Sequence, residues 1–153
     1  MKVRRIVTGH DASGRSTVWK DAEATHQSRR IEGLESTLLW ASDEVPAAFD
    51  GVEDPSARKM GIAPPPGGTR FSLLEIQPGN QHFMHRTDTV DYVVCVAGTI
   101  DMDLDGGEVV KMHAGDVLIQ RGTNHSWVNR GSVPARIAVV LVDGKPKRGG
   151  VKP

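Results

Sequence analysis

The sequence is poor in cysteine, in aromatic residues and in net charge. Cys95 is the single cysteine of the 153 residues, which excludes an internal disulfide framework and a zinc site built from several thiolates. A lone thiol is typical of a reducing compartment, so we expect a cytoplasmic protein. Lysine plus arginine and aspartate plus glutamate both number 19, and this balance indicates no preference for nucleic acid or an anionic membrane.

Long apolar segments are also absent. No stretch approaches the ~18 consecutive apolar residues of a membrane-spanning helix, and Met1–Asp11 lacks the apolar core of a secretory signal. The composition still supports a folded interior, because hydrophobic residues make up 38% and glycine adds 17 residues. We therefore expect one globular domain that has neither a membrane nor a nucleic acid as a partner.

Glycines and prolines divide the second half of the sequence into short runs that are rich in valine, isoleucine and leucine. Runs of this kind, separated by turn dipeptides, are typical of antiparallel strands. They cover Arg70–Gln77, Thr89–Ala97, Thr99–Leu104, Glu108–Met112, Asp116–Gln120, His125–Asn129 and Ala135–Val142. The pattern predicts an all-β fold, a single antiparallel β-barrel or jelly roll with eight or more strands in residues 70–142 and less than about 10% helix.

The first 69 residues have a weaker pattern, and we expect them to pack on the barrel or on a partner subunit. Strands are predicted at Val3–Thr8, Thr17–Trp19 and Ser36–Ala41, loops at Lys20–Glu35 and Asp54–Gly68, and one helical turn within Asp43–Phe49. Residues 143–153 are expected to form a basic, flexible tail. The first two strands have no evident local partner, so we expect a homodimer in which they add to the partner's sheet.

Two segments carry a more specific pattern: Gly79–Gly98 reads GNQHFMHRTDTVDYVVCVAG, and Gly115–Asn129 reads GDVLIQRGTNHSWVN. Together they resemble the two motifs of the cupin superfamily. The first segment keeps the spacing from a glycine to His85 and from the carboxylate of Asp91 to a second glycine. The second segment keeps an opening Gly-Asp, the motif histidine at His125 and the closing asparagine. The resemblance covers roughly residues 70–142 and implies a small, single-domain cupin barrel that assembles as a homodimer.

The departures from the two motifs bear on function. The family site that the resemblance implies holds a divalent metal, such as Fe, Mn, Ni or Zn, with three histidines and one glutamate. Here Thr87 stands where the second histidine is expected, Asp91 replaces the glutamate, and Gln120 replaces a proline in the second motif. The chain therefore keeps two histidines and one shortened carboxylate of the implied metal site.

Strand parity indicates how these groups meet. Residues of like parity share a face of a strand, which would turn His85, Asp91 and His125 into the barrel interior. Two imidazoles and one carboxylate are the facial set that binds Fe(II), so these three residues are the predicted metal ligands. They are also the predicted catalytic groups. His82 would join them only if its segment bulges, because it lies three residues before His85.

The same parity predicts a pocket for a small-molecule ligand. Trp127 shares the face of His125 and would form a wall against which a flat or apolar molecule stacks. Thr87, Tyr92 and Met102 are predicted to line the same pocket. The side chains of Phe83, Met84 and Ile119 would extend its wall.

Three functions remain open from the sequence. The first is a metal-dependent enzyme that acts on a small organic acid, ketone or aromatic metabolite, and the resemblance implies oxygenation, decarboxylation, isomerisation or dehydration. The second is a metal-free enzyme in which His85 and His125 serve as general acid and base and Asp91 orients one of them. The third is a module that binds a small molecule without turnover.

Overall fold

The computed structural model describes residues 1–49 and 51–145, and nearly all of its regular structure is β-strand. The strands are β1 (Arg4–His10), β2 (Ser16–Glu23), β3 (Gln27–Ile31), β4 (Leu34–Ser42), β5 (Thr69–Ile76), β6 (Thr89–Ala97), β7 (Thr99–Leu104), β8 (Val109–His113), β9 (Val117–Arg121), β10 (His125–Val128) and β11 (Ala135–Asp143). In the part of the chain that is described, a 3₁₀ turn, η1 (Pro55–Ala57), is the one helical element. The all-β expectation and the low helix content are thus confirmed.

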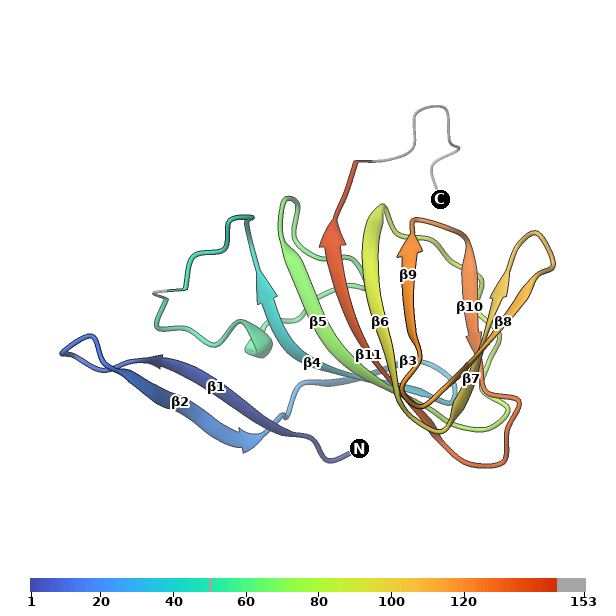
Figure 1. Ribbon diagram of the computed structural model, residues 1–153, viewed down its shortest axis with the longest axis horizontal. Helices are drawn as coiled ribbons and strands as arrows, with labels where there is room; N and C mark the ends of the chain where they lie inside the picture. Colours follow the sequence, from blue (N-terminus) through green and yellow to red (C-terminus); the bar gives the residue numbers. More distant parts are fainter. Residues whose placement is uncertain (50, 146–153) are drawn as a thin grey trace.

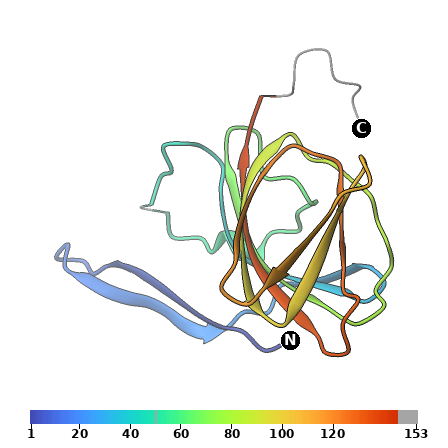
Figure 2. The same cartoon turned by 45° about the vertical axis from the view of Figure 1, so that its right-hand side comes forward.

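Two antiparallel sheets curve around a common interior (Figures 1 and 2). The larger sheet has the order β3-β4-β5-β11-β6-β9, and the smaller has the order β10-β7-β8. Fully buried aliphatic side chains from both sheets, such as Ile76, Ile100 and Ile137, form the core between them. The sheets do not join into one closed ring, so the architecture is a jelly roll.

The seven runs predicted after residue 69 are all strands, and none of their limits moves by more than one residue. The expectation of eight or more strands within residues 70–142 is wrong, because β5 to β11 are seven. The large sheet is completed from the N-terminal side, where β4 pairs with β5 and β3 pairs with β4. All of β3 and the first two residues of β4 lie in Lys20–Glu35, which was expected to be a loop.

The remaining N-terminal expectations are also corrected. Residues Asp43–Phe49 contain no helical turn, and the turn of 3₁₀ helix forms later, where Asp54 caps it and Pro55 opens it. The strands β1 and β2, for which no local partner was evident, pair with each other. They form a hairpin that projects from the jelly roll (Figures 1 and 2). The predicted basic tail lies outside the described residues from residue 146 onward.

Side chains of β6 alternate between the interior of the jelly roll and its outer surface. Thr89, Asp91, Val93 and Cys95 are buried, whereas the residues between them are half-exposed or exposed. The strand ends at Gly98, which has a φ of 74° and lies so close to the Pro134 carbonyl that a Cβ would meet it at 2.8 Å. Only glycine fits this turn without strain, which explains the closing glycine of the first motif. No helix of the described residues is long and apolar enough to cross a membrane.

Candidate functional site

A cavity of about 110 Å³ opens on the inner face of the large sheet. Most of its wall is aliphatic or aromatic. The apolar lining side chains are Ile31, Leu34, Met60, Ile62, Leu74, Trp127, Val139 and Leu141, and the titratable or charged ones are Arg30, Arg70, His85, Asp91 and His125. A confined apolar space with a few polar groups is typical of a site for a small organic molecule and not for a polymer.

Two imidazoles lie side by side in this cavity. His85 and His125 exchange backbone hydrogen bonds of 2.9 Å in an isolated bridge, which joins the first motif to the start of β10. Their ring centroids are 4.4 Å apart and the planes are inclined by 46°. The rings of Trp127 and His125 form a T-shaped pair with centroids 5.9 Å apart, and Phe83 stacks on His85 with centroids 5.1 Å apart. The bridge thus brings together two histidines that are 40 positions apart in the sequence.

Backbone carbonyls fix which ring nitrogens carry hydrogen. The Nδ1 atom of His85 lies 3.1 Å from the carbonyl oxygen of Phe83, and the Nδ1 atom of His125 lies 3.0 Å from that of Thr123. A carbonyl only accepts, so each Nδ1 carries the hydrogen and donates it. The Nε2 atom of each ring is therefore the nitrogen that is left to accept a proton.

The carboxylate of Asp91 is held by two buried neighbours. Thr89 donates to Oδ1 at 2.6 Å, and the Nε2 atom of Gln120 donates to Oδ2 at 3.1 Å. The same amide nitrogen lies 3.3 Å from Nε2 of His125, the ring nitrogen that can accept from it, and 2.8 Å from Nδ1, which is itself a donor. Thr123 donates to the amide oxygen of Gln120 at 2.9 Å. Gln120 therefore links the carboxylate to the imidazole.

Burial moves both groups toward their neutral forms. Desolvation raises the pKa of Asp91, although the hydrogen bonds from Thr89 and Gln120 and the charge of His85 act in the opposite direction. Desolvation also lowers the pKa of His125 to about 4, and His85 adds to this while the Thr123 carbonyl opposes it. At neutral pH His125 is thus an uncharged imidazole.

The predicted metal ligands all line the cavity, but their present arrangement does not fit a divalent ion. Both oxygens of Asp91 accept hydrogen bonds, and the amide N–H₂ of Gln120, a donor, lies between Asp91 and His125 where a cation would need lone pairs. Thr87 supplies a hydroxyl in place of the missing imidazole. In residues 1–49 and 51–145, no three histidine, cysteine or acidic side chains are grouped to hold a metal. Metal binding by His85, Asp91 and His125 therefore stays a prediction.

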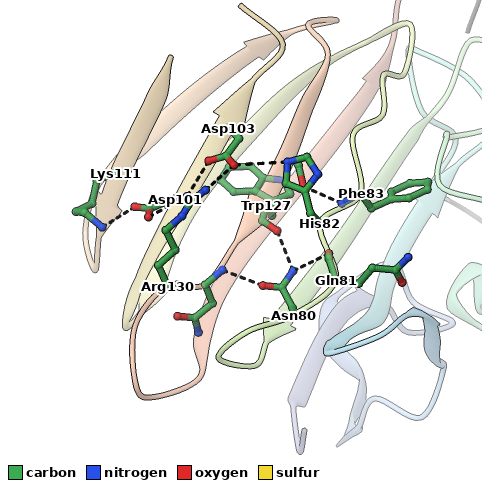
Figure 3. Close-up of polar contacts among 11 residues, drawn as sticks. Asn80, Gln81, His82, Phe83, Asp101, Asp103, Lys111, Trp127 and Arg130 are labelled. Atoms are coloured by element: carbon green, nitrogen blue, oxygen red, sulfur yellow. Dashed lines mark hydrogen bonds and ion pairs between the residues drawn. The ribbon is translucent and has the colours of Figure 1, made fainter. Parts of the chain in front are cut away.

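His82 lies outside the cavity. Its side chain is 53% exposed, and its Nε2 atom is 3.5 Å from Oδ2 of Asp103, which also binds Arg130 (Figure 3). The segment does not bulge inward, so the condition under which His82 would join the site is not met.

The predicted pocket residues divide into two groups. Trp127 and Thr87 line the cavity. Tyr92 does not, because the alternation of β6 turns it outward and leaves it half exposed, while Met102 is buried in the core. Among the residues expected to extend the wall, Ile119 is 55% exposed, and none of the three lines the cavity.

The asparagines of the two motifs hold the site together. Asn80 donates to the Trp127 carbonyl at 2.9 Å and accepts from the backbone of Asn129 at 2.8 Å (Figure 3). The Asn129 side chain in turn donates to the carbonyls of Ile76 and Val133. The segment that carries His85 is thereby fixed to β10, which carries His125.

Sequence reasoning gave no role to three residues of the site, of which Gln120 contacts Asp91 and the other two line the cavity. Gln120 was noted only as a departure from the motif. Arg30 and Arg70 come from β3 and β5, and they line the cavity with the histidines. The inward position of Arg70 could have been predicted from the sequence. In an alternating strand it shares a face with Ser72 and Ile76, which are buried.

The fold and the site define a class: a small jelly-roll protein whose cavity holds two adjacent imidazoles and a buried carboxylate. The cupin domain model matches residues 72–142, and a relative that contains a cupin domain matches 93% of the chain, so the chain belongs to the cupin family. Its relatives include phomopsin biosynthesis cluster protein C' of Diaporthe leptostromiformis, at 34% identity over 93% of this chain and 79% of the relative. A cupin-domain-containing oxidoreductase of Aspergillus ruber is 32% identical over 93% and 73% of the two chains.

Solved structures share the fold. The polyketide cyclase RemF from Streptomyces resistomycificus is 15% identical with a TM-score of 0.51, and the match covers 76% of this chain and 70% of the cyclase. Ectoine synthase from P. lautus is also 15% identical, with a TM-score of 0.53 over 78% and 70% of the two chains. At this level of identity the likeness extends to the fold alone.

Proposed function

We propose that this cupin is an enzyme that transfers protons on a small organic metabolite without a metal. The observation that carries the proposal is the pair of adjacent imidazoles, linked through Gln120 to the buried carboxylate of Asp91 in an apolar cavity. The names of the relatives support action on metabolites, because one belongs to the phomopsin and another to the oryzines biosynthesis cluster.

The geometry favours different roles for the three groups. His85 is the base, because its Nδ1 hydrogen is committed to Phe83 and its Nε2 atom is left to accept a proton from carbon next to a carbonyl. Asp91, which burial shifts toward the protonated form, donates to the carbonyl oxygen as the enol forms. His125 remains neutral and positions Gln120. His85 then returns its proton to a different carbon of the enol system while the enol oxygen gives its proton back to Asp91, which completes an isomerisation with no net oxidation.

Exchange of carbon-bound hydrogen with solvent tests this function directly. A panel of small 2-oxo and 3-oxo acids is incubated with the chelator-treated protein in D₂O, and proton NMR follows the loss of the signal next to the carbonyl. We expect catalysed exchange that chelator does not reduce. His85→Gln should slow it by about 100-fold or more, the usual contribution of a general base. His82→Gln, three positions away but outside the cavity, is the matched control and should leave the rate unchanged.

The competing function is a metal-dependent oxidation, which the oxidoreductase names of relatives such as the Aspergillus ruber protein favour. Loss of activity in chelator and its return with Fe, Mn, Ni or Zn would support that function and contradict ours. Full activity in a variant that lacks both His85 and His125 would contradict both enzyme mechanisms. Binding without turnover of any compound, with or without added metal, would leave a binding module.

A further inference from the structure

We propose that the cavity takes an organic acid and that Arg70 and Arg30 bind its carboxylate. This inference rests on the proposed function only in treating the cavity as the substrate site, and it names the class of substrate. The evidence comes from a side of the cavity that the catalytic proposal does not use.

Arg70 is a buried cation without a counter-ion. Only 9% of the residue is exposed, and the guanidinium bonds to neutral oxygens alone. Its Nε atom donates to the Ser72 hydroxyl at 3.1 Å, one Nη donates to the carbonyls of Gly61 and Ile62, and the other Nη donates to Ser36 at 3.4 Å. No acidic side chain of the described residues lies within ion-pair distance of it. A buried charge of this kind is costly unless something negative compensates it.

A second cation increases the cost. Arg30 lines the same cavity, donates to the Met60 carbonyl at 3.1 Å and also has no acidic partner in the described chain. Its charge acts on Arg70, and together with desolvation, the larger cause, it lowers the pKa of that guanidinium. Two guanidinium groups that repel each other beside an apolar wall form a natural site for an anion, and their forked donors match a carboxylate.

A neighbouring hollow continues the positive surface. Its volume is about 210 Å³, and it shares Arg30 and Arg70 with the cavity. Lys59 also lines it, as does Arg58, which forms an ion pair with Asp43, and no carboxylate of the described residues lines the hollow. Asp91 is the one acidic residue that lines the main cavity in the described part of the chain, so the basic groups outnumber it. The residues that line the cavity and the neighbouring hollow thus carry a net positive charge, which draws anions toward them.

The register of the sheet gives the distance that a ligand must cover between Arg70 and Asp91. Leu141 of β11 is paired with Arg70 on one side and with Asp91 on the other, so the three residues lie in one row across the sheet. Two strand spacings separate the Cα atoms of Arg70 and Asp91, about 10 Å. An acid that is bound at Arg70 therefore extends toward Asp91 and the histidines. The apolar side chains between, such as Leu141 and Val139, would contact its carbon skeleton.

Paired ligands test the inference without requiring turnover. Calorimetric titration compares benzoate with benzamide, phenylacetate with phenylacetamide, and hexanoate with hexanamide, each pair differing chiefly in the charge. We expect at least one carboxylate to bind about 10-fold more tightly than its amide, as a charge-assisted contact predicts. Arg30→Met should remove most of that preference, and Arg70→Gln should do the same if its thermal unfolding shows that it is folded.

Arg29→Met is the matched control, because Arg29 is adjacent in β3 but pairs with Glu35 outside the cavity. It should keep the preference. Amides that bind as tightly as their carboxylates, or a preference that survives Arg30→Met, would overturn the inference. A merely structural role of the two arginines would weaken both members of a pair equally. If the protein binds carboxylates but catalyses no proton exchange, the proposed reaction is contradicted and this inference is still supported.

Discussion

The cavity has two sides that differ in the kind of charge they carry. The histidine side consists of His85, Asp91 and His125, whose side chains can exchange protons. Burial raises the pKa of Asp91 and lowers that of His125, so it shifts these two groups toward their neutral forms. The arginine side consists of Arg30 and Arg70, which keep their charge at any physiological pH and so cannot exchange protons. Under the two proposals above, the histidine side would perform the proton transfer and the arginine side would bind the substrate.

The largest expected effect separates these two roles in the kinetics. On an acid that undergoes exchange, His85→Gln should lower kcat by about 100-fold or more with little change in KM, because a base acts in the transition state. Arg30→Met should raise KM by about 10-fold with kcat nearly unchanged, because it removes binding that the ground state and the transition state share. Steady-state rates over a range of substrate concentrations measure both.

If Arg30→Met lowered kcat as much as His85→Gln does, the proposed difference between the two sides would be contradicted. Such a result would mean that the arginine side acts in the transition state. The same assays on His82→Gln and Arg29→Met should give wild-type values for both constants, since neither side chain lines the cavity.

The two sides also differ in how far the sequence predicts them. The histidine side follows from spacing within each motif and from strand alternation, both of which are local, and the structure places all three residues on the cavity. The arginine side depends on the pairing of β3, β4 and β5, which brings Arg30 and Arg70 together although they are 40 residues apart. No local pattern contains that pairing.

The sequence pattern did not predict β3 as a strand, and the reason is physical. Gln27–Ile31 is an edge strand in which only Ser28 and Ile31 are partly covered, so its sequence shows little of the alternation that marks a half-buried strand. Gln120 was missed for a related reason. Its role depends on β9 lying against β6, where it is paired with Asp91.

A smaller effect, on stability, tests the histidine side in acid. The pKa of His125 falls from 6.5 to about 4 in the folded protein, so the folded state favours the neutral ring while the unfolded chain takes up a proton below pH 6.5. The stability is therefore complete above pH 6.5 and decreases as the pH falls toward 4, by roughly 3 kcal/mol from this group. Urea unfolding at pH 7 and at pH 4 measures the difference.

His125→Gln should reduce that loss, whereas His113→Gln, at an exposed ring, should leave it unchanged. Asp91 acts in the opposite direction, because its raised pKa means that the folded state gains stability as the carboxylate is protonated. An acid-induced loss of equal size in wild type and His125→Gln would show that the ring is not held neutral.

The smallest effect on the cavity is expected from the β1–β2 hairpin, where we predict the homodimer contact. Arg5 attaches one face of the hairpin to Asp54 and to the Leu39 carbonyl. Ile6 and Val18 lie on the other face, 53% and 57% exposed, and no further strand of the described residues pairs with either edge of the hairpin. Exposed apolar side chains beside open edges are suited to pairing with a second copy. Light scattering at micromolar concentration should therefore give the mass of a dimer.

Replacing both Ile6 and Val18 with serine should halve that mass and leave the carboxylate preference of the cavity within about two-fold of wild type, because neither side chain lines it. Arg15→Ser, at the exposed tip of the same hairpin, is the control that should remain a dimer. A monomeric wild type would contradict the assembly. A serine variant that becomes monomeric and also loses its preference for carboxylates would show that the partner subunit completes the arginine side, and the two sides would then differ in their need for a second chain.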